Sequence, residues 1–256
     1  SGMSAELVNF THAGSGDFTA DVFTLQTESR ADEISFVYDG IPYLNRTKTV
    51  IETDIHIDNS IGKYSFKTDQ IALNDLKIAT EGFFHLVNDS TYNMDISFKA
   101  PSTEFKSILS LIPAVYKKDF EQIKTSGKTL FDGFIKGTYS ATQMPAYAVN
   151  LQIEDGFFQY PDLPKPVKNI NIVLKAHNPD GAMDNAVVDI SKGHIEFGND
   201  PFDFTLQFKK PETDQYLEAT AKGKLDLAGI KEMIPMEGIT KLTGLVTADF
   251  QAKGNL

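Results

Sequence analysis

The sequence contains no cysteine among its 256 residues. This absence excludes disulfide frameworks, zinc–thiolate sites, iron–sulfur clusters and cysteine nucleophiles. No stretch approaches the roughly 20 consecutive apolar residues that a membrane-spanning helix needs, and no signal peptide is visible. Tryptophan is also absent, which counts against a carbohydrate-binding module, because such a module would need exposed aromatic rings beside polar groups.

Positive charge is scarce relative to negative charge. The chain has 24 Lys and Arg against 35 Asp and Glu, a formal net charge of −11. This balance disfavours binding to nucleic acid and electrostatic docking on anionic lipid headgroups. The aromatic residues are 19 Phe and 9 Tyr, which favour strands. The composition therefore predicts an acidic, β-rich protein of one or two domains.

Motifs for catalysis and metal binding are missing or incomplete. None of the five histidines lies two or four positions from another, as metal ligands often do. Gly127-Lys128-Thr129 resembles the end of a phosphate-binding loop, but that motif requires a glycine where Gln122 stands, and a strand-like run follows instead of a helix. Residues 178–184 resemble a calcium loop, yet their glycine is fourth instead of sixth, so we interpret them as a hairpin turn. Gly14-Ser15-Gly16 is interpreted as a loop.

The carboxylates do not form a catalytic pattern. They alternate with apolar residues along strand-like runs, as on a wetted sheet face, and no pair is set in an apolar pocket. We therefore predict that the protein is not an enzyme and that it uses neither a cofactor nor a metal ion.

Alternation of apolar and polar residues dominates the chain. In residues 92–99, Tyr92, Met94, Ile96 and Phe98 alternate with polar side chains, which predicts a strand with one dry and one wet face. The same pattern occurs in residues 49–57, 147–154, 169–175, 202–209 and 217–227. Turn residues separate these runs, and the spacing fits antiparallel hairpins with about 15 strands, too many for a single small sandwich.

Two segments about 120 residues apart repeat each other. Aligned on Ile112-Pro113 and Ile234-Pro235, their apolar positions coincide. The matching pairs are Phe105 with Leu227, Ile108 with Ile230, and Leu111 with Met233. Short helices are predicted within residues 102–123, broken at Pro113, and within residues 226–233. Each precedes a strand-like run that closes on Lys-Gly, residues 129–137 and 242–254.

These patterns predict a mainly β fold. It is either an elongated antiparallel repeat sheet or groove, or an open sandwich, with two or three short helices. Residues 1–3 are interpreted as a remnant of tag cleavage, and residues 4–256 as one elongated β-repeat domain. Its approximate units are residues 18–100, 101–222 and an incomplete 223–256. Three prolines in residues 160–166 exclude a central strand there and predict a rigid extended crossover.

Three segments carry a resemblance to a known family. They are the helix-then-strand unit of residues 105–113 and 129–137, the run from Asp155-Gly156 to Asn169-Ile170, and residues 73–82. With these segments the chain resembles the periplasmic part of AsmA-family proteins, as in Bacteroides-type bacteria, which are related to TamB-like bridge-type lipid carriers. The resemblance covers most of residues 20–256.

The resemblance implies a function and a location. The function is that of a cell-envelope protein whose apolar β-groove carries phospholipids between the inner and outer membranes. Phospholipid acyl chains are the implied ligand, and other envelope proteins are further partners. The implied location is the periplasm, with an inner-membrane anchor formed by an N-terminal helix that this sequence does not contain.

Apolar strand positions are the candidate lipid-binding residues. They are Tyr147, Val149, Leu151, Ile153, Ile170, Ile172, Leu174, Phe202, Phe204, Leu206 and Phe208. The alternative is that these side chains pack against each other as an ordinary core. Two other functions stay open: a structural or outer-membrane-protein-assembly scaffold, and a carbohydrate-binding β-module.

Overall fold

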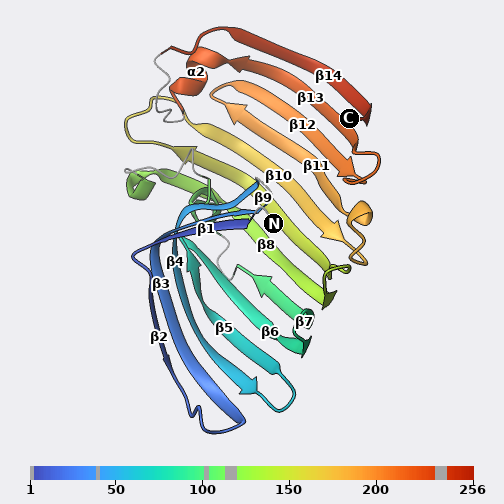
Figure 1. Ribbon diagram of the computed structural model, residues 1–256. Helices are drawn as coiled ribbons and strands as arrows, with labels where there is room; N and C mark the ends of the chain where they lie inside the picture. The colour runs from blue at the N-terminus through green and yellow to red at the C-terminus, as the bar shows by residue number, and fades with distance from the viewer. Residues whose placement is uncertain (1–2, 39–40, 101–103, 113–119, 234–240) are drawn as a thin grey trace. The chain divides into compact units, whose positions relative to one another are not determined.

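The computed structural model describes residues 3–38, 41–100, 104–112, 120–233 and 241–256 (Figure 1). Strands make up 71% of the structure and form one open antiparallel sheet of 14 strands, so the prediction of a mainly β antiparallel fold is confirmed. The strands follow one another in chain order from β3 to β14, while β1 and β2 both pair with β3. Such a meander needs no crossover connections.

The chain divides into two compact units. Unit 1 comprises Ser1–Ser102 and Phe134–Pro145, and unit 2 comprises Thr103–Gly133 and Ala146–Leu256. The predicted division into three repeat units stays a prediction. Strand β8 (Lys124–Tyr139) contributes residues to both units.

Seven further strands lie in the part of unit 1 that the structure describes. They are β1 (Met3–Val8), β2 (Thr11–Ser15), β3 (Val22–Tyr38), β4 (Ile41–Asp58), β5 (Lys63–Leu73), β6 (Leu76–Asn88) and β7 (Thr91–Lys99). Strand β2 pairs with residues 26–30 of β3, and β1 pairs with residues 33–38. The interpretation of Gly14 and Ser15 as a loop is therefore wrong, because backbone pairing to a long neighbouring strand overrides the low strand propensity of the Gly-Ser sequence.

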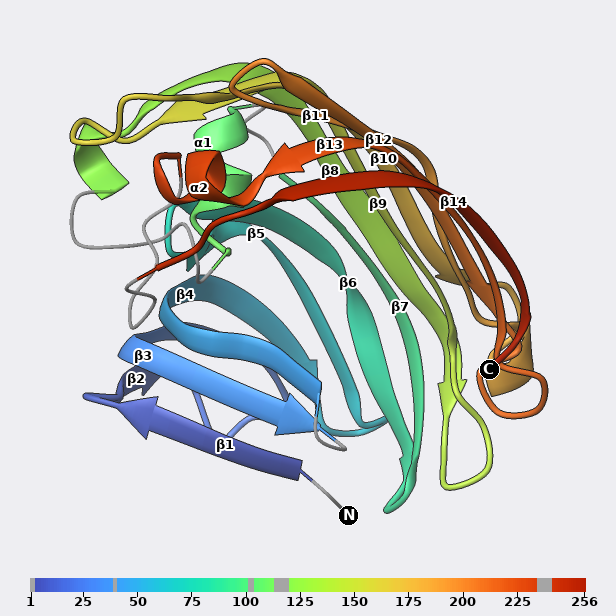
Figure 2. The same ribbon diagram turned by 90° about the horizontal axis from the view of Figure 1, so that it is seen from above.

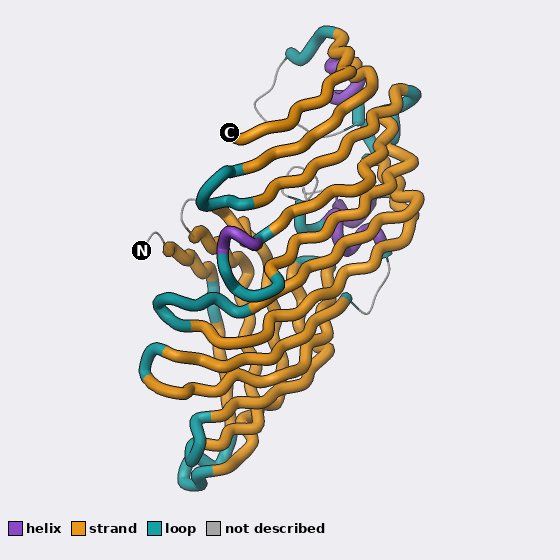
Figure 3. Tube along the Cα trace, turned by 90° about the vertical axis from the view of Figure 1, so that its right-hand side faces the viewer, coloured by secondary structure: helices purple, strands orange, loops and turns teal. Residues whose placement is uncertain are grey.

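The described residues of unit 2 form six further strands and four short helices. The strands are β9 (Ala146–Gln159), β10 (Val167–Asn178), β11 (Val187–Phe197), β12 (Asp200–Lys209), β13 (Tyr216–Asp226) and β14 (Leu245–Asn255). The helices are α1 (Phe105–Leu109), the 3₁₀ turns η1 (Phe120–Gln122) and η2 (Met183–Asn185), and α2 (Leu227–Lys231). Figure 3 shows β9 to β14 running side by side as neighbouring strands.

The helical segments are shorter than the sequence predicts. Helix α1 ends at Leu109, and the predicted break at Pro113 lies outside the described residues. Helix α2 covers five of the eight predicted residues, and its N-cap Asp226 accepts a hydrogen bond from the Ala228 amide at 3.0 Å. Helices this short are not stable alone in water, so both depend on packing against the sheet.

The proline-rich residues 160–166 form a turn, not a crossover. Strands β9 and β10 on either side of it pair antiparallel, with Phe158 opposite Val167. Val167 begins β10, as predicted. Prolines fit here because a tight connection between antiparallel strands does not require their missing amide hydrogens.

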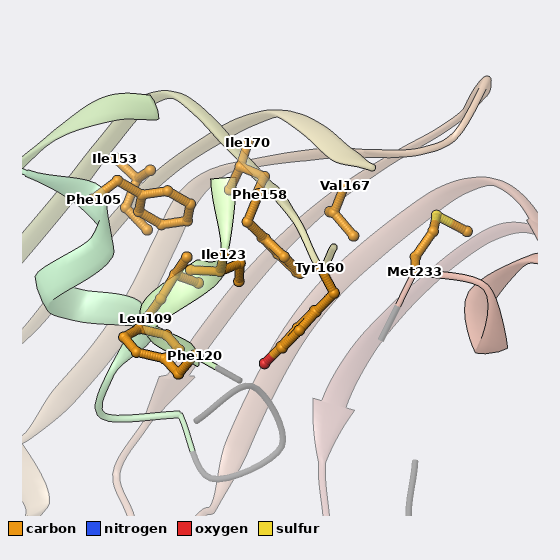
Figure 4. Close-up of a cluster of buried hydrophobic side chains, with 10 residues drawn as sticks. All are labelled: Phe105, Leu109, Phe120, Ile123, Ile153, Phe158, Tyr160, Val167, Ile170 and Met233. Carbon is orange, nitrogen blue, oxygen red and sulfur yellow. The ribbon is translucent and has the colours of Figure 1, made fainter. Parts of the chain in front are cut away.

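A hydrophobic cluster joins the helices of unit 2 to the sheet. Figure 4 shows its ten buried side chains: Phe105, Leu109, Phe120, Ile123, Ile153, Phe158, Tyr160, Val167, Ile170 and Met233. They come from α1, η1, the turn after η1, β9 and its following turn, β10, and the turn after α2. In Figure 2 the strands β9 to β14 bend, and α1 and α2 lie on the concave side of the bend. The cluster therefore fixes one end of β9 and β10 from that side, and Ile195 and Phe197 of β11 pack against it.

Candidate functional site

All eleven predicted lipid-binding residues lie on one face of the unit 2 sheet. Antiparallel partners point to the same side, and one row of partners runs Ile153, Ile172, Gly193, Phe204, Ala221 and Phe250. A second row runs Leu151, Leu174, Ile190, Leu206, Ala219 and Ala252, and a third runs Val149, Ala176, Val188, Phe208, Leu217 and Gly254. Tyr147, Ile170 and Phe202 continue the same alternation. We call this side the apolar face of unit 2.

Burial divides these residues into two groups. Ile153 and Ile170 are 6% and 4% exposed and belong to the hydrophobic cluster, while Leu151 and Ile172 pack against it. The other seven side chains keep part of their surface accessible. They are Tyr147, Val149, Leu174, Phe202, Phe204, Leu206 and Phe208. The helices thus cover the apolar face near the cluster and leave it partly open along β10, β11 and β12.

The apolar face also contains residues that the sequence analysis missed. Ile190, Ile195 and Phe197 of β11 lie on it, in register with β12. A bulge between Ile190 and Gly193 shifts the alternation from even to odd positions, so a strict period of two fails across this strand. The sequence contained one signal that β11 is irregular. A glycine, Gly193, stands inside the strand, and a second, Gly198, directly follows it.

Phe204 covers a glycine on the neighbouring strand. A Cβ atom at Gly193 would lie 2.5 Å from two atoms of the Phe204 ring, so the ring occupies the space that a side chain at Gly193 would fill. The centroids of the Phe202 and Phe204 rings are 6.2 Å apart. Phe204 thus fills, on the apolar face, the place that the missing side chain of Gly193 leaves open.

Unit 1 has an apolar face of the same kind. One row of antiparallel partners runs Phe23, Ile57, Tyr64, Phe84 and Met94, and the next runs Leu25, Ile55, Phe66, Gly82 and Ile96. The rings of Tyr64 and Phe84 stack with centroids 4.7 Å apart. Apart from Ile57, which is buried, the large side chains of these rows are partly exposed. The strand faces predicted for residues 49–57 and 92–99 are confirmed.

The opposite face of unit 2 carries paired charges. His194 Nδ1 lies 2.6 Å from Asp203 Oδ1, and its Nε2 lies 3.7 Å from Glu196. A hydrogen bond from Asn169 and the nearby Lys168 ammonium lower the pKa of the Glu196 carboxyl. Asp203 and Glu196 are thus matched with donors on this face. In the described part of the chain, no three His, Asp or Glu side chains are grouped to hold a metal ion.

The segment that resembles a calcium loop is a hydrogen-bonded turn. Asn178 is fully buried, its Oδ1 accepts hydrogen bonds from the amides of Asp180 and Gly181, and its Nδ2 donates to the Ala182 carbonyl. Asp180 accepts from the Ala182 amide. These polar atoms are occupied by the protein itself, as expected for an Asx turn, so the interpretation as a hairpin turn is confirmed.

A hollow of about 530 Å³ lies in unit 1 over β2 to β5. Its lining is dominated by polar side chains, among them Glu28, Glu52, Asp54, Lys67 and Gln70. It coincides with the bulges of the β4–β5 and β5–β6 pairings after Glu52 and Thr68. A polar, open hollow of this kind does not suit an acyl chain, so it is separate from the candidate site.

Comparison with known proteins gives no assignment. No protein-family model matches the chain, and no curated protein or solved structure is similar to it at a significant level. None of the described helices has the length and apolarity needed to span a bilayer.

Proposed function

We propose that the chain is a non-enzymatic protein of the bacterial cell envelope whose apolar face binds phospholipid acyl chains. The observation that supports this most is the partial exposure of the seven apolar side chains from Tyr147 to Phe208, which lie on one face of β9, β10 and β12. Soluble proteins seldom leave a contiguous apolar patch uncovered unless it binds something. An acyl chain is a suitable occupant because the rows present aliphatic and aromatic carbon and no charged side chain.

The composition of the rows also suits movement of a lipid. Apolar contact stabilises by about 25 cal/mol per Å² removed from water, without a preferred direction. Neighbouring rows offer similar surfaces, Leu174–Ile190–Leu206 in one and Ile172–Gly193–Phe204 in the next. An acyl chain that advances by one row leaves one such surface and contacts another of the same kind. Its binding free energy therefore stays favourable along the rows without a single deep minimum. This is the behaviour that a lipid conduit requires.

The cellular setting of this proposal follows from the AsmA-like resemblance. It is transport of phospholipids between the inner and outer membranes by a periplasmic protein that is anchored in the inner membrane through a segment outside this sequence. Other envelope proteins would be its partners. The apolar faces of the two units, each considered by itself, are consistent with binding along many strands instead of in one pocket.

The experiment is to measure phospholipid bound to the protein purified from bacteria, by native mass spectrometry and by lipid extraction. Phe204→Asp and Leu206→Asp place a carboxylate among the open rows, where an acyl chain would have to desolvate it. We expect each variant to lose most of the bound lipid while circular dichroism shows an unchanged β spectrum.

The matched control is Thr205→Asp. Thr205 lies between the two on the same strand but points to the opposite face, where its hydroxyl contacts Thr220. This variant adds the same charge to the same strand, and we expect it to retain the lipid. Absence of lipid from the wild-type protein, or equal loss in all three variants, would argue instead for a structural scaffold.

A further inference from the structure

The outer edge of β14 exposes both backbone groups and apolar side chains. In the described part of the chain β14 pairs with β13 alone. Val246, Phe250 and Leu256 are 43%, 53% and 77% exposed. Proteins protect sheet edges with prolines, charged side chains or bulges; β14 has no proline and pairs without a bulge, and its charges are one Asp and one Lys. Such an edge is suited to receive another strand.

The hydrogen-bond pattern shows which residues face the open edge. The Leu256 amide donates to the Gln215 carbonyl at 3.3 Å, so the even-numbered residues direct their backbone groups towards β13. The pairing of β13 with β14 is continuous from Tyr216–Asn255 to Asp226–Leu245, which keeps this alternation intact. The odd-numbered residues from Leu245 to Asn255 therefore present their N–H and C=O groups to the open side. A partner strand has to pair through them.

The charges on these residues select one partner and one register. Asp249 and Lys253 are the charged residues of β14, and they stand two positions on either side of Gln251. If β14 meets β14 of a second copy in antiparallel orientation centred on Gln251, each Asp249 lies opposite the other copy's Lys253. A register centred on Asp249 would oppose two carboxylates, and one centred on Lys253 would oppose two ammonium groups. Opposite charges across a strand pair stabilise and like charges destabilise.

We propose that β14 pairs with β14 of a second copy of this chain, antiparallel and centred on Gln251. Asp249 already lies 3.9 Å from Lys222, and Lys253 lies 3.4 Å from Glu218, both on β13. The proposed pairing adds a further opposite charge beside each of these ion pairs, contributed by β14 of the second copy. On the other side it places Phe250 opposite Ala252, a large residue against a small one, and Val246 opposite Leu256. The apolar face of unit 2 then continues into the second copy.

The test is sedimentation velocity of the full chain over a concentration series. We expect a dimer that dissociates on dilution, because a single strand–strand contact is a small interface.

Gln251→Pro removes an edge-facing N–H that β13 does not use, and we expect this variant to be monomeric with an unchanged thermal midpoint. Asp249→Lys and Lys253→Asp each place like charges opposite one another twice, so we expect dimerisation to weaken at least about tenfold.

Mixing the two charge variants gives the decisive result. The Asp249→Lys variant has lysine at both positions 249 and 253, and the Lys253→Asp variant has aspartate at both. A dimer of one copy of each therefore sets a lysine opposite an aspartate at both places. We expect differently labelled copies to form this mixed dimer with about the wild-type affinity. Asp162→Lys, an exposed turn residue, changes the net charge as Asp249→Lys does and is expected to leave the dimer unchanged.

Several results would overturn the proposal. They are a wild-type protein that stays monomeric throughout, a dimer that survives Gln251→Pro, charge variants that do not associate when mixed, and species that grow beyond a dimer. The last result would mean that β14 pairs with a different edge of the next copy. Lipid binding is measured separately, since Phe204→Asp leaves β14 intact, so failure of this pairing and failure of the proposed function are distinguishable.

Discussion

At the scale of the residue, close packing over glycine holds α1 on the sheet. A Cβ atom at Gly156 would lie 2.9 Å from Ile170 Cβ and 3.1 Å from Phe105 Cε1. The ring of the first residue of α1 therefore lies directly over the backbone of β9. This contact explains why a helix of only five residues stays in place.

We predict that Gly156→Ala destabilises the protein by about 1–3 kcal/mol, because the added methyl group overpacks the cluster. Urea unfolding followed by circular dichroism measures the change. The control is Gly229→Ala in α2, where the nearest atom to a new Cβ atom is 3.4 Å away and alanine favours the helix. Equal destabilisation by both substitutions would contradict this account of α1.

The buried Asn178 supports a second prediction at this scale. Asn178→Ala leaves the amides of Asp180 and Gly181 and the Ala182 carbonyl without the partner that the side chain gives them. Leaving buried polar groups without partners costs about 1–3 kcal/mol, so we expect a loss of unfolding free energy in that range. Asn185→Ala, in the same turn but exposed, is the control and should cost clearly less. Added calcium should not restore the stability of Asn178→Ala, since the turn is held by protein hydrogen bonds.

At the scale of the element, the cap of α2 decides whether this helix forms. Asp226→Ala removes the acceptor for the Ala228 amide and should cost about 0.5–2 kcal/mol in unfolding free energy. Asp226→Asn keeps an oxygen in the same place and should cost less. Thermal unfolding of both variants compares the two effects, and a loss of the same size in each would show that the charge, and not the cap, is what matters.

The connection between η2 and the turn after β12 predicts a pH dependence. Asp184 accepts hydrogen bonds from the hydroxyl and the amide of Thr213 at 2.6 and 3.1 Å, and the hydroxyl bond chiefly lowers the pKa of this carboxyl from its ordinary value of 3.8. A lowered pKa in the folded state means that the stabilisation is complete above the ordinary value. It is lost as the pH falls through the lowered value.

We therefore expect wild type and Asp184→Ala to differ in urea midpoint by a constant amount near neutral pH, and the difference to shrink in strong acid. Thr213→Val should remove most of that pH dependence, because it deletes the hydroxyl donor. A difference that grows on acidification would have the wrong sign for this interaction.

Elements and their faces were predictable from the sequence where alternation is regular. Residues 202–209 alternate without interruption, and Phe202, Phe204, Leu206 and Phe208 share a face as predicted. The alternation changes phase at bulges, as between Ile190 and Gly193 of β11, where the sequence analysis missed the apolar-face residues. Bulges also occur where Asp155 and Asn169 adopt left-handed backbone conformations with φ of 50° and 51°. Local sequence does not specify which strand shifts against which, because a bulge depends on the partner strand as well.

The coverage of the candidate site was not predictable from the sequence. Ile153 on β9 and Phe204 on β12 lie in the same row of cross-strand partners, yet Ile153 is buried and Phe204 is partly open. The difference comes from α1 and η1, which pack on β9 and β10 and not on β12. Contacts between segments distant in the chain decide burial, and a pattern within one strand does not contain them.

At the scale of the whole molecule, the helix-plus-strand repeat has a structural meaning. Helix α1 stands between β7 and β8, and α2 stands between β13 and β14. Both insertions interrupt an otherwise hairpin-connected meander at the same point of the repeat, six strands apart. The cluster includes Phe105 and Leu109 of α1 and Met233 just after α2. The repeat therefore marks the places where the apolar face is covered, and the strands between them carry the open rows.

The central claim is that acyl chains lie on the open rows of the apolar face. The most direct measurement uses a phospholipid with a photoreactive diazirine in its acyl chain, followed by mapping of the labelled residues by mass spectrometry. We predict labelling of apolar-face residues of β10 to β12, such as Leu174, Ile190 and Leu206, with little on the opposite face. Labelling confined to the polar face, or none above that of a soluble control protein, would contradict the account.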